Sequence, residues 1–136
     1  MSDIRITRKE QLNSNTPQTA GMLRLAGING ELSDSTKISG GLMIAEPRTG
    51  SSVHHHGEQE TVIYVLSGSG QVRWGRHGEN CETVRPGDFV FIPAGVAHQE
   101  VNPTDETVVW VVVRSGAQPM VVNLPGFDAV VSVSPK

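Results

Sequence analysis

With 136 residues, the chain is long enough for one domain and too short for two ordinary ones, so we expect a single domain over 1–136. Its 11 Lys and Arg residues are scattered among 14 Asp and Glu, which excludes the electrostatic signature of a nucleic-acid-binding surface. The polar N-terminal segment, the single cysteine (Cys81) and the absence of an apolar stretch of roughly 20 residues predict a cytoplasmic protein without a disulfide framework or a membrane span.

Short strand-like runs follow one another along the chain. The first part offers a short helix candidate at 7–12 and an apolar run at 22–26 that contains Arg24. Turn signals separate the later runs, among them 75–78 and the Pro86-Gly87 pair, which suits the centre of a type II turn. The runs rich in β-branched and aromatic residues are 38–45, 61–66, 71–74, 89–92 and 107–113. This rhythm predicts an all-β fold with a barrel core at about 38–114.

Two segments suggest packing beyond the barrel wall. The run 108–113 is apolar at every position, which indicates a strand buried on both faces, either beneath a covering strand or beneath a second subunit. The tail 119–136 carries apolar residues and is expected to pack across the barrel or a partner; these are Val121, Val122, Phe127, Val130 and Val131.

Three consecutive histidines, His54 to His56, precede the run 61–66. Side chains alternate along an extended segment, so His54 and His56 share one face and His55 faces the other way. Two imidazoles spaced in this manner can bind one cation together.

Other side chains can complete such a site. Glu58 and Glu60 follow the histidines closely, and His98 lies on a later strand that a barrel can bring alongside. Three imidazoles and a carboxylate suit a divalent transition metal (Fe, Mn, Ni, Co, Cu or Zn) better than Ca or Mg. His77, at an expected hairpin tip, is interpreted as a solvated loop residue.

These residues resemble the two sequence motifs of the cupin family. The second cupin motif is Gly, five residues, Pro, one residue, Gly, two residues, His, three residues and Asn. The chain matches every fixed position of it, at Gly87, Pro93, Gly95, His98 and Asn102.

The first cupin motif is Gly, five residues, His-any-His, three or four residues, Glu, six residues and Gly. His54, His56 and Glu60 fit it, but only three residues separate Gly50 from His54, and seven residues separate Glu60 from Gly68. The residue that has six residues between it and Gly68 is Thr61.

The resemblance implies a small antiparallel double-stranded β-helix, or jelly-roll barrel, and a homodimer. It also implies one divalent transition metal in the barrel mouth, held by His54, His56, His98 and Glu60. The offset in the first motif leaves two alternatives open. Either three histidines form the site with Thr61 pointing inward, or Glu58 replaces Glu60.

The family includes dioxygenases, decarboxylases, isomerases, cyclases and non-catalytic binding proteins. The resemblance therefore implies a metal-dependent, dioxygenase-like enzyme acting on a small organic molecule, with Glu60 as a catalytic base. The alternatives are a non-catalytic metal- or ligand-binding module and an isomerase- or cyclase-type cupin.

Strand parity adds four candidates for substrate contacts: Glu100, Arg73, Trp110 and Arg24. Glu100 shares a strand face with His98. The other three have simpler interpretations, because Arg73 suits a solvated face, Trp110 a core position and Arg24 a surface charge on an edge strand.

Overall fold

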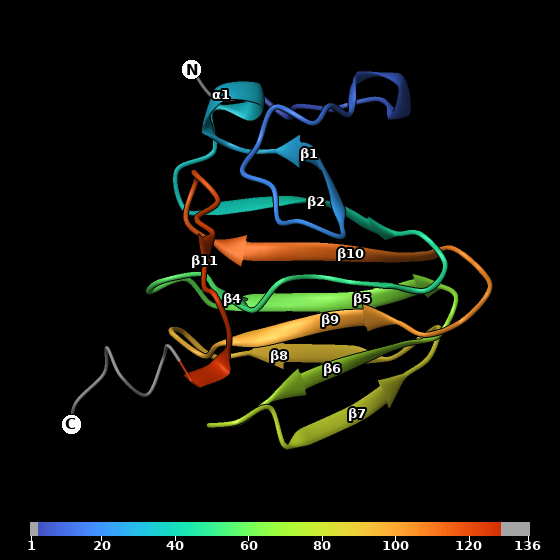
Figure 1. Ribbon diagram of the computed structural model, residues 1–136. Coiled ribbons are helices and arrows are strands. Elements are labelled where there is room, and N and C mark those ends of the chain that lie inside the picture. Colours follow the sequence, from blue (N-terminus) through green and yellow to red (C-terminus); the bar gives the residue numbers. More distant parts are fainter. Residues whose placement is uncertain (1–2, 129–136) are drawn as a thin grey trace.

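The computed structural model describes residues 3–128. Within this range the strands form two antiparallel sheets of a double-stranded β-helix (Figure 1). The first sheet has the order β1 (Leu23–Ile28), β2 (Ile38–Ala45), β10 (Val108–Ser115), β5 (Thr61–Ser67) and β8 (Phe89–Ile92). The second has the order β11 (Val122–Asn123), β4 (His54–His55), β9 (His98–Asn102), β6 (Gly70–Trp74) and β7 (Asn80–Val84), and β3 (Thr49–Gly50) also pairs with β9. Several paired strands, such as β4 with β9 and β2 with β10, are distant in sequence, so residues of different motifs meet.

The all-β prediction is confirmed, and most strands were predicted closely. The runs 38–45 and 89–92 coincide with β2 and β8, and the runs assigned to β5, β6 and β10 agree within two residues. Strand β7 was not predicted, because its sequence is largely polar and all its residues but the last are exposed. The helix candidate at 7–12 is only a 3-10 turn, η1 (Lys9–Gln11), and a short helix, α1 (Gly30–Ser33), was not predicted.

The predicted turns are present. Asp88 N–H donates to Arg85 O at 2.9 Å, and Gly87 between them has a φ of 98°, which a type II turn requires at its third residue. The turn 75–78 joins β6 to β7, with Gly78 N–H donating to Gly75 O at 3.1 Å.

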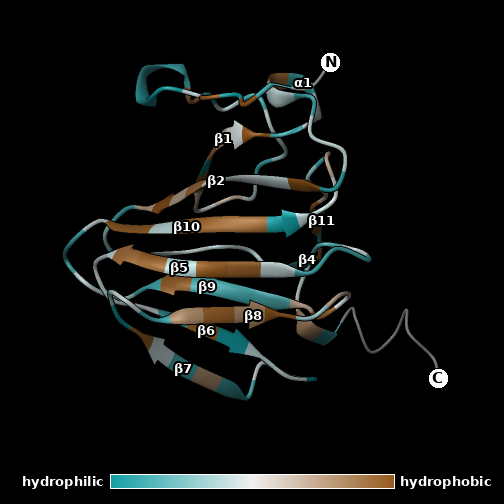
Figure 2. Cartoon of the chain, turned by 180° about the vertical axis from the view of Figure 1, so that it is seen from behind, coloured by the Kyte–Doolittle hydropathy of each residue, from teal (hydrophilic) through white to brown (hydrophobic). Residues whose placement is uncertain are grey.

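The core lies on the inner face of the first sheet. Met43, Ile63, Val65 and Trp110 are at most 1% exposed there. Alternate residues of β10 point outward, and of these Val113 is 41% exposed. The expectation that a strand of this chain covers the outer face of β10 is therefore wrong for the described residues. Figure 2 shows β5, β8 and β10 as largely hydrophobic strands.

The described part of the C-terminal tail packs on the barrel, as expected. Strand β11 pairs with β4 and places Val122 opposite His55 and Asn123 opposite His54. Val130 and Val131 lie outside the described residues. Among residues 3–128, none of the helices has the length and hydropathy needed to cross a membrane.

Candidate metal centre

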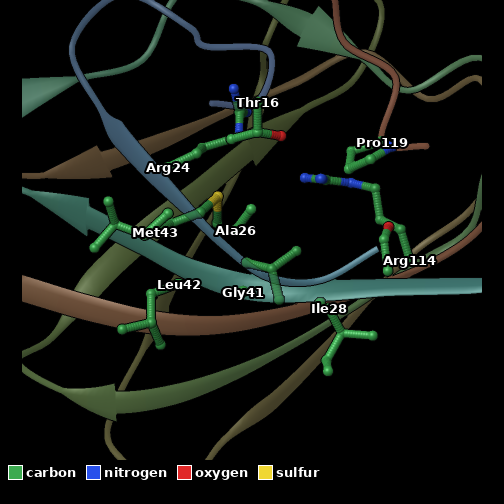
Figure 3. A pocket seen from close by; sticks show the side chains of 13 residues that line it. Thr16, Arg24, Ala26, Ile28, Gly41, Leu42, Met43, Arg114 and Pro119 are labelled. Carbon is green, nitrogen blue, oxygen red and sulfur yellow. The ribbon is translucent and has the colours of Figure 1, made fainter. Parts of the chain in front are cut away.

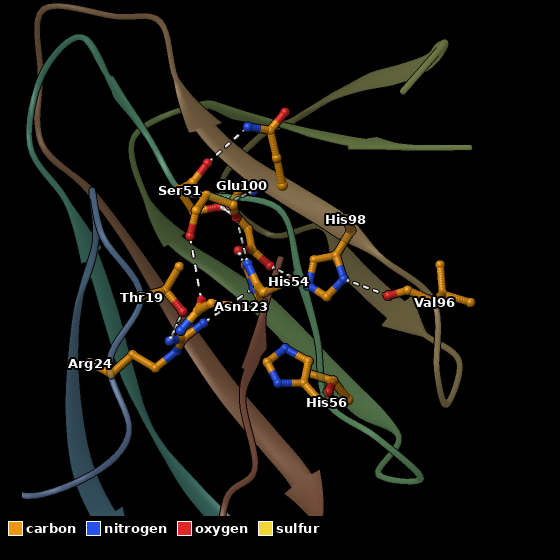
Figure 4. Close-up of polar contacts among 12 residues, drawn as sticks. Thr19, Arg24, Ser51, His54, His56, Val96, His98, Glu100 and Asn123 are labelled. Atoms are coloured by element: carbon orange, nitrogen blue, oxygen red, sulfur yellow. Dashed lines mark hydrogen bonds and ion pairs between the residues drawn. The ribbon is translucent and has the colours of Figure 1, made fainter. Parts of the chain in front are cut away.

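The structure brings His54, His56 and His98 together inside the barrel (Figure 4). His54 on β4 pairs directly with His98 on β9, and His56 follows β4 on the same face as His54. The three side chains are at most 2% exposed, and one ring nitrogen of each lies within 4.8 Å of the others. Two short strands thus place three imidazoles around one point.

Each of the three imidazoles is oriented by a backbone carbonyl. The Nδ1 atoms of His54, His56 and His98 lie 2.8, 2.8 and 2.9 Å from the carbonyl oxygens of Ser52, Met120 and Val96, in that order. A carbonyl oxygen only accepts, so each Nδ1 carries the proton and donates. The Nε2 lone pairs are left facing the interior, which is the usual arrangement of metal-binding histidines.

A carboxylate completes the cluster, and it comes from Glu100 on β9. Its Oε1 lies 3.2 Å from His54 Nε2, and its Oε2 lies 2.9 Å from His98 Nε2. Glu100 is 1% exposed because it shares the inward face of β9 with His98 and Asn102. Parity with His98 is the sequence signal that points to it.

The donor set fits a metal ion. Both Glu100 oxygens and His98 Nε2 are buried without a hydrogen-bond partner among the described residues. Because the Nδ1 atoms carry the protons, carboxylate oxygens face imidazole lone pairs, and acceptors this close require positive charge between them. Three imidazole nitrogens and one carboxylate are a ligand set for a divalent transition metal.

Burial and nearby charges set the ionisation of the cluster. Burial, followed by the Arg114 guanidinium, lowers the pKa of His56 to about 2, so this imidazole is neutral. Burial acts to raise the pKa of Glu100, whereas positive charge at the adjoining His98 and His54 Nε2 atoms, from protons or from a bound cation, lowers that pKa well below its ordinary value.

Two buried arginines border the cluster. Arg24 on β1 donates to Thr19 Oγ1, and its Nη2 lies 3.3 Å from His54 Nε2. Arg114 on β10 has its Nε 3.2 Å from Thr61 Oγ1 and its Nη2 3.3 Å from His56 Nε2. Burial lowers the pKa of both, to about 10 for Arg114, yet both remain cationic at neutral pH. Arg24 is thus not the surface charge of the simpler interpretation.

The second motif supplies the local geometry of this site. Gly87 and Gly95 have φ values of 98° and 76°, which favour glycine at these turns. The amide nitrogen of Asn102 donates to the carbonyl oxygens of Ala45, Glu46 and Glu106 at 2.7–3.0 Å. Asn102 therefore ties the end of β9 to the neighbouring loops, and His98 is the motif residue that faces the cluster.

The structure does not place Glu60, the predicted metal ligand and catalytic base, at the cluster. Its backbone continues the pairing of β5 with β10, because Glu60 N–H donates to Ser115 Oγ and Glu60 O accepts from Ser115 N–H, both at 3.0 Å. Thr61 then points inward at 1% exposure, and Glu60 points outward and is exposed. The alternative with Thr61 inward agrees with the structure, and Glu58 is exposed too.

Two predicted substrate contacts lie away from the cluster. Arg73 binds Gln99 Oε1 and Gly78 O and lies over the Phe127 ring, on the outer face of β6. Trp110 is a core residue of the first sheet. Both correspond to the simpler interpretations, a solvated face and a core position.

The remaining chemically notable residues also lie outside the cluster. His55 faces away from it and accepts a hydrogen bond from Gly57 N–H. His77 is exposed at the β6–β7 turn, 2.8 Å from Asp128. Cys81 is exposed on the edge strand β7.

Two cavities flank the histidines. One, of about 470 Å³, opens between β6, β7 and β8, with His98 in its wall beside Trp74 and mainly apolar side chains. The other, of about 30 Å³, lies near β1, β2 and β10, and Figure 3 shows Arg24 and Arg114 among its lining residues. Arg114 was not among the site residues predicted from the sequence, although it shares a strand face with Trp110 and Val112.

The profile of the family described as Cupin domain matches residues 41–114, which include the three histidines and Glu100. No curated protein matches the chain.

Solved structures share the fold. An uncharacterized double-stranded β-helix protein from Klebsiella pneumoniae has a TM-score of 0.68 at 16% identity, over 89% of this chain and 97% of that one. The polyketide cyclase RemF from Streptomyces resistomycificus has a TM-score of 0.68 at 23% identity, over 99% and 94%. Bacillus subtilis oxalate decarboxylase has a TM-score of 0.68 at 19% identity, over 81% of this chain and only 30% of that one.

Proposed function

Because the chain belongs to the cupin family, we propose that it is a metal-dependent enzyme that acts on a small organic molecule inside its barrel. The observation that carries this proposal is the buried cluster itself: three imidazole nitrogens converge there, and beside two of them lie both oxygens of Glu100, which have no hydrogen-bond partner among the described residues. The cluster does not stabilise the fold, because burying polar and charged groups without hydrogen-bond partners is unfavourable.

In this proposal, His54, His56, His98 and Glu100 hold one divalent transition metal. When bound, the metal supplies Lewis acidity and a template for the substrate, and a redox-active metal also supplies dioxygen chemistry. The backbone carbonyls behind the histidines hold the rings in place. The apolar cavity beside His98 admits the substrate and limits the access of water.

Dioxygenase-type chemistry is the first reaction class to test. The three histidines, with the Glu100 carboxylate beside two of them, form a donor set compatible with the redox-active metals that such chemistry needs. A solved structure of similar fold belongs to an oxalate oxidase, with a TM-score of 0.69 at 21% identity. We therefore expect oxygen uptake with a suitable substrate when the protein carries iron, manganese, nickel or copper.

Cyclase-type chemistry is the second candidate. The polyketide cyclase aligns with 99% of this chain and 94% of its own length, so the two proteins have nearly the same extent. A cavity of about 470 Å³ is large enough for a molecule with more than one ring. This candidate predicts a zinc-loaded protein that consumes no oxygen.

Metal analysis followed by oxygen-electrode assays tests the proposal. The untagged protein should contain about one equivalent of metal, as measured by elemental mass spectrometry, and consume oxygen with a subset of small aromatic and enolisable compounds. His98→Ala should abolish both properties. If the purified protein contains no metal and takes up no metal when it is added, the metal-dependent function is refuted. If the protein binds metal and a small ligand but catalyses no reaction, it is a binding module.

We also propose that the protein is a homodimer through the outer face of the first sheet. A row of apolar side chains crosses this face, in which Val62 pairs with Val113 on one side and with Phe91 on the other. These three residues are 41–58% exposed in the single chain. An exposed apolar sheet face of this kind is typical of a subunit interface.

A further inference from the structure

The charges beside the histidines do not balance within the described residues. Arg24 and Arg114 are 4% and 5% exposed, yet neither forms an ion pair with a carboxylate anywhere in 3–128. Glu100 is the buried carboxylate of the cluster, so the two guanidinium groups exceed it by one positive charge. A divalent metal at the histidines would raise this excess further, and buried excess charge is unfavourable unless an anion joins it.

The hydrogen bonds of the two arginines are also incomplete. Arg24 Nε is buried without a partner, and the guanidinium groups otherwise contact hydroxyls and the Nε2 atoms of His54 and His56. When these lone pairs are given to a metal, both arginines lose their imidazole acceptors. Each guanidinium then has a planar set of donors free, which matches the two oxygens of a carboxylate.

The two cavities have different chemical character and lie at opposite ends of the first sheet. The arginines lie between the narrow cavity near β1 and the histidines, since each lines that cavity and contacts an imidazole. The wider cavity lies near β8, and its lining includes Val72, Val84, Ile92 and Trp74, with His98 at the wall. A ligand bound at the cluster therefore meets cations on one side and apolar side chains on the other.

We infer that the substrate is a small carboxylic acid with an apolar body, held through its carboxylate by Arg24 and Arg114 and through its apolar part by the cavity between β6, β7 and β8. This inference names the substrate class of the proposed enzyme and rests on that proposed function. The arginines are binding residues that orient the acid, and the metal ligands are a separate set.

Binding of three probes to the protein, at its measured metal content, tests the inference by calorimetry. The probes are 3-phenylpropanoate, which has both parts, 3-phenylpropan-1-ol, which lacks the charge, and propanoate, which lacks the ring. We expect 3-phenylpropanoate to bind at least about thirtyfold more tightly than the alcohol, because a buried charge pair is lost. It should bind at least about tenfold more tightly than propanoate, because the ring is no longer buried.

Variants separate the two parts of the site. Arg24→Met and Arg114→Met should each lower the affinity for 3-phenylpropanoate by at least about thirtyfold. Both variants should change the affinity for the alcohol little and keep the metal content. Val84→Phe, which narrows the apolar cavity, should lower the affinity for 3-phenylpropanoate but not the affinity for propanoate. Arg73→Met, at an arginine on the outer face of β6, is the matched control and should change none of these affinities.

Each outcome decides between the two proposals. Equal affinity for acid and alcohol in metal-containing wild-type protein would overturn this inference and leave the metal-dependent function standing. A preference for the acid in protein that binds no metal would support the inference and refute the metal-dependent function. The comparison of probes on the wild type decides the matter even if an arginine variant does not fold.

Discussion

The exchange of Glu100 for Gln is the most informative single substitution, because structure and sequence motif disagree about which carboxylate serves the site. Glu100→Gln keeps the size of the side chain and removes one negative charge that lies 2.9 Å from His98 Nε2 and 3.2 Å from His54 Nε2. A cation held by these nitrogens would lie about 4 Å or less from the carboxylate, because metal–imidazole bonds are about 2 Å long. At that distance each pair of unit charges contributes about 4 kcal/mol at an effective dielectric constant of about 20.

Part of this energy is offset, because the neutral amide no longer carries the penalty for burying a charge. We therefore expect the metal affinity of Glu100→Gln to fall by at least about 100-fold. Glu60→Gln, at the exposed position that fits the first motif, should change it less than about threefold. Titration of metal-depleted protein against a chromophoric chelator measures both values, and circular dichroism checks that both variants fold. A larger loss for Glu60→Gln than for Glu100→Gln would refute the assignment.

Three further predictions concern other parts of the structure. His98→Ala should lose stoichiometric metal in elemental analysis, whereas His77→Ala, at an exposed histidine, should keep it; retained metal in the first variant would contradict the site. Asn102→Ala should lower the free energy of unfolding by about 3 kcal/mol in guanidinium denaturation, since its amide donates to three carbonyls. Exposed Asn80→Ala should change it by less than about 0.5 kcal/mol, and equal effects would show that Asn102 does not tie the loops. Phe91→Lys should convert the dimer to a monomer in light scattering, whereas Ile6→Lys should not; a monomeric wild type would refute the proposed interface.

The strands that were predictable are those whose side chains face an apolar interior. The runs that became β2, β5, β8 and β10 are rich in β-branched and aromatic residues, which favour strands. Strand β7 has no such pattern, because it lies at a sheet edge and most of its residues are exposed. Segment 80–84 is a strand because it pairs with β6, and the composition of the segment does not indicate this pairing.

The histidines of the cluster were predictable and its carboxylate was not, because the face on which a side chain lies depends on its position along the strand. A spacing of two residues keeps His54 and His56 on one face whatever strand follows. The orientation of Glu60 depends instead on where β5 begins, and its backbone bonds to Ser115 set that start so that Thr61 faces inward. Glu100 was recognised as inward-facing by parity with His98, but not as the carboxylate of the centre.

Arg114 was missed because β10 is apolar on both faces. No alternation in 108–113 distinguishes the inner from the outer side, so only parity with Trp110 indicated the face of Arg114, and nothing in the sequence placed it beside the histidines. The register of β10 with β2, which places Arg114 opposite Ser39, determines it. Arg24 was ambiguous because β1 is an edge strand, where a charge usually faces solvent.

The metal content of untagged protein, measured by elemental mass spectrometry after equilibration with a mixture of divalent transition metals, tests the central claim most directly. The buried set of three imidazoles and one carboxylate predicts about one equivalent of one such metal per chain. Protein that retains no metal after this treatment would contradict the claim, and the cluster would then have to carry its positive charge as protons.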